Sequence, residues 1–270
     1  MTPGDGPARR FLQGEPAGDG SWCFAIGRER HGAFGGAFGG LLTACCVHLA
    51  RAATGGRRAA SVDARFVRGL PAGRARFVPT VVHDGRTLTT LAVDVYDEHD
   101  RVATRATVGL VAPGELPEVD HPGEAGPPPC AVPWEEGRGW GSTGPDARAG
   151  GDVPIVATFR PRAVGRGDRG FGTALPVPWE DDPAAFAEAA CLAADMCVGP
   201  PVAAAFPGRP TPAPNPDLSL RFTGRPVGRE VVGWGRLERI DHGLATTRVE
   251  VRSEDELVAT GVSCSLLVGA

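Results

Sequence analysis

The sequence repeats itself at a fixed spacing, and this internal repeat limits the fold more than any other feature. Three pairs of segments are each 156 residues apart: 93–95 and 249–251, 102–104 and 258–260, and Phe66 and Phe222. The first two pairs read VDV against VEV and VAT against VAT. Matches that keep one register indicate a duplicated structural unit. We therefore expect two copies of one unit rather than one large domain.

Each copy is expected to contain a β-hairpin and one buried helix. The repeated strands are separated by short polar turns, DEHDR and RSEDE, which are typical of antiparallel hairpins. Phe38–Ala53 carries apolar residues at helical spacing. In the second copy, a helix over 184–198 is predicted to begin at Asp182-Pro183 and to stop at Gly199-Pro200-Pro201. The predicted fold class is α+β, with an antiparallel sheet wrapped around one central helix, made twice.

A stretch rich in proline and glycine separates the two copies. From about Pro113 to Gly151 the sequence is acidic and has no hydrophobic periodicity, so it cannot bury enough apolar surface to fold alone. The predicted organisation is an N-terminal unit over 1–112, a linker over 113–152 and a C-terminal unit over 153–270.

The composition excludes several functions. The chain has no lysine, since all 28 basic residues are arginine, so lysine-dependent phosphate loops and Schiff-base enzymes are ruled out. A net charge of −4 provides no basic surface for nucleic acid. No stretch approaches the roughly 18 apolar residues of a membrane helix, and the first residues do not resemble a signal peptide. None of the seven cysteines has zinc-site spacing, which predicts reduced thiols in a cytoplasmic protein. No metal or other cofactor is expected.

The order of these elements resembles the hotdog superfamily, specifically the double-hotdog acyl-CoA thioesterases of the thioesterase II type. The resemblance covers about residues 24–112 and 153–268. It rests on AFGGAFGGLLTA, DARFVRGLPAGRARF and HDGRTLTTLAVDVYDEHDRVATRAT in the first copy, and on AACLAADMCVGPP, PNPDLSLRFTGRP and DELVATGVSCSLLV in the second. It implies a double hotdog that hydrolyses an acyl-CoA or a carrier-protein-bound acyl thioester. It also implies a homodimer formed through the hotdog sheets.

The resemblance also implies where the active site lies. In that family an Asp on the second helix, a Thr or similar residue before the next strand, and a Gln on the last strand hold the attacking water. These positions fall on Asp195, on or near Asn215, and on Ser263. The Asp is kept and the other two differ. Asparagine can still orient water, whereas serine is much shorter than glutamine, so either the site is rearranged or the activity is altered.

Asp195 is also prominent without the resemblance. It is the only charge in the last three turns of a helix that is otherwise Ala, Cys, Leu and Met. A carboxylate in apolar surroundings has a raised pKa and is a better general base near neutral pH. The alternative is a structural carboxylate that is bonded to an arginine or to the nearby loop.

The glycine-rich run GAFGGAFGG over 32–40 opens the first helix. Its free N–H groups and the helix dipole would favour a developing negative charge, so Gly35, Gly36, Phe38 and Gly39 are predicted to bind substrate. The alternative is a tight turn that allows close packing of helix and sheet.

His31, just before this run, leaves a second reaction open. In hotdog dehydratases a His before one helix works with a carboxylate on the other, so His31 and Asp195 could act on a thioester-bound polyketide-like or fatty-acid-like intermediate. The reaction would be that of a dehydratase, hydratase or cyclase. A surface turn histidine is the other interpretation of His31. A third hypothesis is a non-catalytic acyl-binding module. No motif identifies the acyl chain or indicates whether the protein acts in lipid or secondary metabolism.

Overall fold

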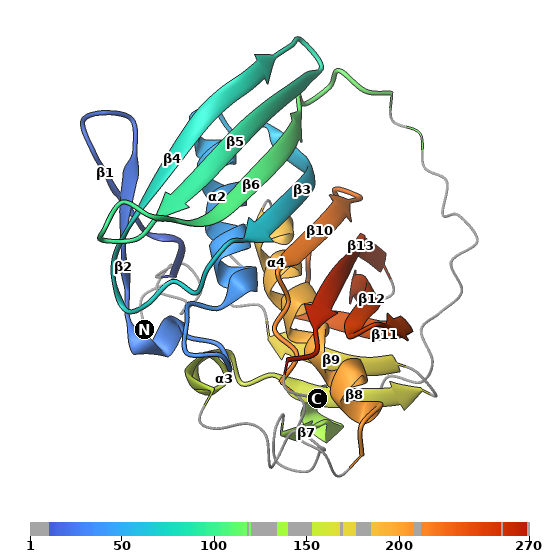
Figure 1. The fold of residues 1–270 in the computed structure, drawn as a ribbon. Coiled ribbons are helices and arrows are strands. Elements are labelled where there is room, and N and C mark those ends of the chain that lie inside the picture. The colour runs from blue at the N-terminus through green and yellow to red at the C-terminus, as the bar shows by residue number, and fades with distance from the viewer. Residues whose placement is uncertain are drawn as a thin grey trace.

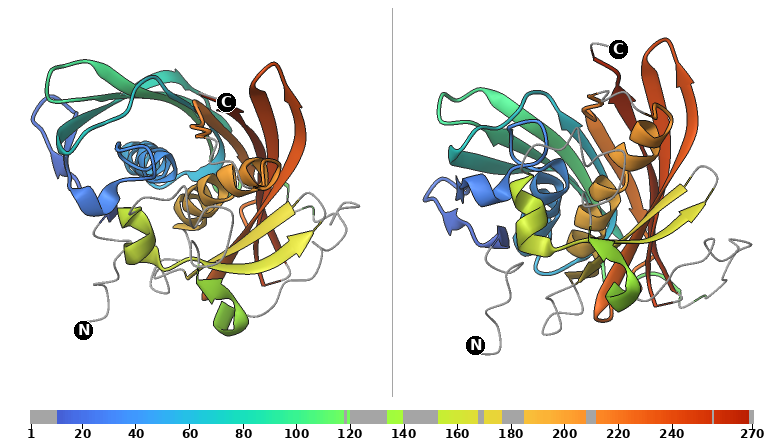
Figure 2. Two further views of the ribbon diagram at one scale, coloured as in Figure 1. Left: turned by 60° about the horizontal axis from the view of Figure 1, so that its bottom comes forward. Right: turned by 90° about the horizontal axis from the view of Figure 1, so that it is seen from below.

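The computed structural model shows two buried helices inside a strongly curved antiparallel sheet (Figures 1 and 2). It describes residues 11–117, 119, 134–139, 153–167, 170–176, 185–207, 212–254 and 256–268. Most of the predicted linker and the predicted helix start at Asp182-Pro183 lie outside these residues. The unit boundaries at 112 and 152 therefore stay predictions.

The first unit wraps its strands around a single helix, α2 (Gly39–Ala53). The predicted helix over Phe38–Ala53 is confirmed to within one residue, with Phe38 as its N-cap. The strands are β1 (Glu15–Pro16), β2 (Trp22–Ile26), β3 (Arg58–Phe66), β4 (Gly73–Asp84), β5 (Leu88–Tyr96) and β6 (Val102–Val111). A short 3-10 helix, η1 (Arg28–Arg30), precedes the glycine-rich turn.

The second unit repeats this plan around α4 (Phe186–Met196), all of whose residues are buried. Its other elements are α3 (Pro154–Phe159), α5 (Gly199–Ala204), β8 (Arg162–Gly167), β9 (Gly170–Pro176), β10 (Asp217–Phe222), β11 (Glu230–Asp241), β12 (Leu244–Ser253) and β13 (Glu256–Leu266). Helix α4 ends at Met196, three residues before the expected stop at Gly199-Pro200-Pro201, and a separate short helix, α5, begins at Gly199. Proline is tolerated in the first turn of a helix, where its missing N–H has no partner to lose.

Part of the predicted linker is structured. The 3-10 helix η2 (Trp134–Glu136) is followed by β7 (Arg138–Gly139), which pairs with β8 at the edge of the second unit. Arg162 of β8 stacks over the Trp134 ring and donates hydrogen bonds to nearby carbonyl groups. These contacts supply the packing partner that the composition of this segment did not reveal.

All described strands belong to one sheet, in the order β1-β2-β4-β5-β6-β3-β10-β13-β12-β11-β9-β8-β7. The order reads as two mirrored halves that meet at β3 and β10, as a duplication requires. Both predicted hairpins are confirmed, as β5–β6 and β12–β13. The register shifts after Val95 in the first hairpin and after Val251 in the second, again 156 residues apart.

The two halves are joined by antiparallel pairing of β3 with β10 (Figure 1). Two ion pairs cross this seam on the exposed face of the sheet, Arg65 with Asp217 and Arg221 with Asp63. The predicted sheets are therefore one continuous sheet.

The helices α2 and α4 lie side by side and antiparallel within the curve of the sheet (Figure 2). Gly40, at the start of α2, contacts Asp195 near the end of α4, while Arg51 near the end of α2 contacts Glu188 near the start of α4. The helical stretch Phe186–Ala204 is long and apolar enough to cross a membrane, which corrects the expectation that no stretch approaches this. Since 89% of it is buried inside the protein, its apolar character reflects its place in the core.

Candidate active site

Asp195 lies where the two units meet, in the last turn of α4 against the first turn of α2. Only 7% of the residue is exposed. Its Oδ2 accepts a hydrogen bond from the Gly40 N–H at 2.7 Å, and its Oδ1 accepts one from Asn215 Nδ2 at 2.7 Å. The site is therefore composite, with a helix start from the first unit and a carboxylate and an amide from the second.

Burial raises the pKa of Asp195 from 3.8 to about 6, although the hydrogen bonds from Asn215 and Gly40 oppose this shift. The positive end of the α2 dipole also favours the charged form. At neutral pH Asp195 is thus a carboxylate that takes up a proton more readily than an ordinary aspartate. This is the property that a general base requires.

The glycines at the start of α2 allow this close approach. A Cβ on Gly40 would lie 2.7 Å from both Asp195 Cβ and the Cys191 carbonyl oxygen. A Cβ on Gly39 would lie 2.7 Å from the Phe66 ring and 3.2 Å from Asp195 Oδ2. Within the described part of the chain, the Gly39 N–H has no acceptor. It is one of the first helical N–H groups, which have no partner inside the helix.

The other residues of the glycine-rich run have different positions. Gly35 is exposed at the tip of the turn with φ +75°, a conformation that favours glycine. A Cβ on Gly36 would approach the Gly69–Leu70 backbone, at 3.1 Å from Gly69 Cα. Phe38 is half-buried, and its ring lies beside Gly40. Of the four predicted substrate-binding residues, Phe38 and Gly39 are therefore near Asp195, and Gly35 and Gly36 shape the turn.

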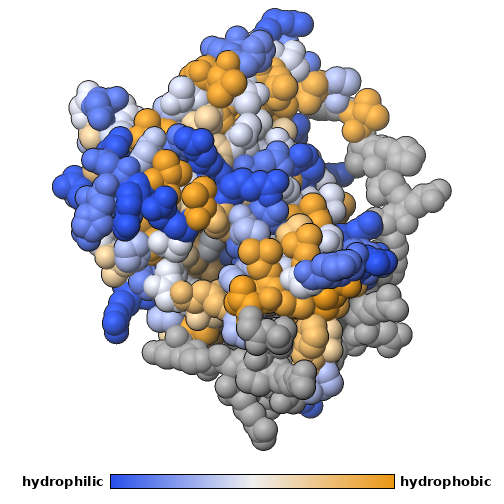
Figure 3. Space-filling view, in the orientation of Figure 1, coloured by the Kyte–Doolittle hydropathy of each residue, from blue (hydrophilic) through white to orange (hydrophobic). Residues whose placement is uncertain are grey.

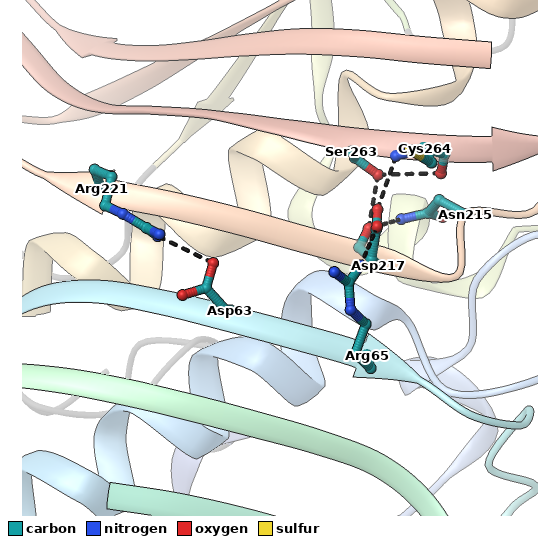
Figure 4. Close-up of polar contacts among 7 residues, drawn as sticks. All are labelled: Asp63, Arg65, Asn215, Asp217, Arg221, Ser263 and Cys264. Carbon is teal, nitrogen blue, oxygen red and sulfur yellow. Dashed lines mark hydrogen bonds and ion pairs between the residues drawn. The ribbon is translucent and has the colours of Figure 1, made fainter. Parts of the chain in front are cut away.

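Ser263 is buried but is not bonded to Asp195. Its hydroxyl donates to the Asp217 carbonyl oxygen at 2.6 Å and to the Cys264 carbonyl oxygen at 3.3 Å (Figure 4). The Asp217 carbonyl oxygen also accepts from Asn215 Nδ2 at 3.3 Å. Ser263 is thus connected to Asn215 only through the Asp217 carbonyl oxygen among the described residues. Asp217 was missed from sequence, where its position beside Asn215 and Pro216 was the available signal.

His31 is buried, so the interpretation as a surface histidine is wrong. It lies at the turn before α2, where its carbonyl oxygen accepts the Ile155 N–H of α3. Its Nε2 is buried and has no hydrogen-bond partner among the residues that the structure describes. Among the described residues, no hydrogen bond or ion pair joins His31 to Asp195.

The thiols near the site do not provide a nucleophile. Cys45, Cys46, Cys191 and Cys197 are buried and free. Burial raises the pKa of the Cys45 and Cys197 thiols to about 12 and that of the Cys46 and Cys191 thiols well above 9.0. They stay protonated at neutral pH and fill the core as small apolar side chains.

Two hotdog units in tandem, with a carboxylate where their helices meet, define the chain as a double-hotdog protein. Residues 28–111 match the family model of the acyl-CoA thioesterase N-terminal domain. This match supports the expected thioesterase family and enzyme class over the first unit, and the shared fold of the solved structures extends over both units. No curated protein matches the sequence.

Solved structures from several bacteria share this fold at low sequence identity. An acyl-CoA thioesterase II, TesB2, from Mycobacterium marinum is 16% identical with a TM-score of 0.73, covering 96% of this chain and 97% of that chain. A conserved protein with a hot dog fold from Alicyclobacillus acidocaldarius is 17% identical with a TM-score of 0.72, covering 97% and 98%. The dehydratase domain of RzxB from Pseudomonas fluorescens is 12% identical with a TM-score of 0.63, covering 94% and 96%.

Proposed function

We propose that this protein hydrolyses the thioester of an acyl-CoA or of an acyl chain on a carrier protein, with a water molecule activated by Asp195. The observation that carries the proposal is the position of this carboxylate. It is buried, its pKa is raised to about 6, and it lies between a helix N-terminus and the Asn215 amide. The family match over residues 28–111 supports an acyl-CoA thioester as the substrate.

In the proposed reaction, Asp195 takes a proton from water as the water oxygen attacks the thioester carbonyl carbon. The carbonyl oxygen becomes an oxyanion, and we propose that it accepts a hydrogen bond from the Gly39 N–H at the positive end of α2, which has no acceptor among the described residues. Collapse of this intermediate breaks the C–S bond. The departing thiolate takes the proton back from Asp195, which leaves a free acid and a free thiol.

Asn215 is proposed to orient the water. Its Nδ2 is used by Asp195 and by the Asp217 carbonyl oxygen, and its Oδ1 has no donor among the described residues. That oxygen is free to accept the second proton of the water in a hydrogen bond. Ser263 then acts indirectly, through its hydrogen bond to the Asp217 carbonyl oxygen.

The test is thiol release from a series of acyl-CoAs, from acetyl to palmitoyl, by the wild type and by Asp195→Ala. Asp195→Ala is expected to lower kcat by about 100-fold or more, in the range of general-base catalysis. Equal thiol release by the two proteins would remove the hydrolase assignment. Asp63→Ala, a half-exposed carboxylate on the sheet surface, is the control for loss of a charge.

A dehydratase is the second candidate, because the buried Nε2 of His31 has no partner within the described part of the chain and the RzxB dehydratase domain shares the fold. It would release water rather than thiol from a 3-hydroxyacyl thioester. His31→Ala would abolish this activity and leave thiol release intact. Binding of acyl-CoA without either product would instead favour the acyl-binding module.

We also propose that a cytoplasmic homodimer forms through the outer faces of the sheets. Exposed apolar residues lie together along β12, β13 and the segment that follows: Leu244, Val262, Leu266 and Val268. Figure 3 shows hydrophobic surface over this part of the C-terminal sheet. Leu244 is paired with Leu266 across the two strands. Light scattering should give the dimer mass for the wild type and the monomer mass for Leu266→Arg.

A further inference from the structure

We infer that Asp217 is a positioning residue for the Asp195 site and that Arg65, from the other hotdog unit, holds it in place. The inference rests on the proposed function, because it concerns how the residues of that same site are held in position. It makes the seam between β3 and β10 part of the catalytic apparatus, although Arg65 lies on the exposed face of the sheet.

Four hydrogen bonds converge on Asp217 (Figure 4). Its carboxylate accepts from the Cys264 N–H at 2.7 Å and from Arg65 Nη1. Its carbonyl oxygen accepts from Ser263 Oγ at 2.6 Å and from Asn215 Nδ2 at 3.3 Å. The side chain of Asp217 is therefore fixed by β3 and β13, and its main chain fixes the amide that contacts Asp195.

This arrangement arises where the backbone pairing of β10 with β13 ends. Pairing of β10 with β13 runs from Phe222 to Ser219, which pairs with Val262. Beyond that point, side chains replace the backbone ladder, since Ser263 donates through its hydroxyl and Cys264 donates to a carboxylate. The Asp217 carbonyl oxygen is thereby left free to accept the Asn215 amide as well.

The duplication provides a matched control. Arg221 is the equivalent of Arg65, 156 residues further on, and it also forms an ion pair across the seam, with Asp63 at 3.1 Å. The two arginine side chains are similarly exposed, at 63% for Arg65 and 58% for Arg221. Within the described residues, Asp63 has no bond to Asn215, Ser263 or Asp195. The two ion pairs thus differ in whether they connect to the site.

Loss of Arg65 should act on the Asn215–Asp195 bond and not on acyl binding. With one anchor of Asp217 removed, its carbonyl oxygen holds the Asn215 amide less firmly. The hydrogen bond from Asn215 lowers the pKa of Asp195, so weakening it raises that pKa. The other titratable groups recorded near Asp195 are the buried thiols of Cys191 and Cys197, which stay protonated.

The experiment compares the full-length wild type with Arg65→Ala, Arg65→Lys, Arg221→Ala and Asp217→Asn, using an acyl-CoA that the wild type cleaves. Arg65→Ala and Asp217→Asn should lower kcat about tenfold, as for the loss of one net hydrogen bond, with KM unchanged. The acidic limb of the kcat/KM profile should move up by about half to one pH unit. Arg65→Lys should recover most of kcat, and Arg221→Ala should match the wild type.

A second measurement does not need turnover. In amide NMR spectra, the side-chain NH2 signals of Asn215 should shift in Arg65→Ala and stay in place in Arg221→Ala. If both arginine variants behave alike in kcat, pH profile and NMR, the inference is overturned and the proposed function stands. If Asp195→Ala releases thiol as fast as the wild type, the proposed function fails, and the inference fails with it.

Discussion

The Gly40 N–H donates a 2.7 Å hydrogen bond to Asp195 Oδ2, and the two residues are 155 positions apart in the chain. The donor belongs to the first hotdog unit and the acceptor to the second. The candidate site consequently forms only when α2 and α4 are docked against each other.

Gly40→Ala should damage both stability and activity. The new Cβ would lie 2.7 Å from Asp195 Cβ and from the Cys191 carbonyl oxygen, so the helices must separate. Overpacking of this kind costs about 1–3 kcal/mol. The midpoint temperature of thermal unfolding and the rate of thiol release should both decrease. The control is Gly18→Ala, where an added Cβ meets nothing within 4 Å, and an equal loss there would contradict this explanation.

Hydrolysis should decline on the acidic side of about pH 6. Asp195 must be deprotonated to accept a proton from water, and burial raises its pKa to about 6. The kcat/KM profile should therefore show an acidic limb near this pH. A limb near 3.8, the ordinary value, would mean that another environment or another base governs the reaction.

Asp195→Asn should make the protein more stable at neutral pH while removing activity. The folded-state pKa lies above the ordinary 3.8, so folding favours the protonated acid. The stabilisation of the fold by the protonated form of Asp195 is complete below pH 3.8 and is lost as the pH rises through about 6. The neutral amide should raise the free energy of unfolding by up to about 3 kcal/mol at about pH 8 and by little at about pH 4. Denaturant titrations at both pH values measure this difference.

Breaking the ion pair at the opposite end of the helix pair should be strongly destabilising. Glu188 is fully buried and accepts from Arg51 Nη1 at 2.7 Å, with His48 Nδ1 at 3.6 Å. Glu188→Ala leaves a largely buried arginine without its partner, which costs about 3–5 kcal/mol. Replacing both Arg51 and Glu188 by leucine should recover most of this loss. Chemical denaturation of the single and double variants tests the coupling, and additive losses would argue against it.

Asn215→Ala should affect catalysis more than Ser263→Ala. Asn215 contacts Asp195 directly, whereas Ser263 acts through the Asp217 carbonyl oxygen. Removing Asn215 also removes a bond that lowers the pKa of Asp195, so the acidic limb should move upward. Steady-state kinetics over a pH series separates the two variants. Equal losses of kcat would place Ser263 in contact with the reacting water instead.

Local sequence patterns predicted the helices and strands, whereas contacts between distant parts of the chain determine the geometry of the site. The repeat of Val93–Val95 at Val249–Val251 located both hairpins, because alternation and turn chemistry act over a few residues. Asp195 could be selected because an isolated charge near the end of an apolar helix is visible in sequence. The bonds of Asp217 to Arg65 and Cys264 were not predicted, since they depend on which strand edges meet. The burial of His31 likewise depends on its contact with α3, which no residue near His31 in the sequence predicts.

The continuous sheet also has a consequence for synthesis of the chain. Strand β3 leaves the ribosome with one edge unpaired, and its partner β10 follows about 150 residues later. At about 5–20 residues per second this edge waits on the order of ten seconds. Unpaired edges invite association with other nascent chains, and charged side chains discourage it. Asp63 and Arg65 supply such charges on β3 before they form the ion pairs of the finished seam.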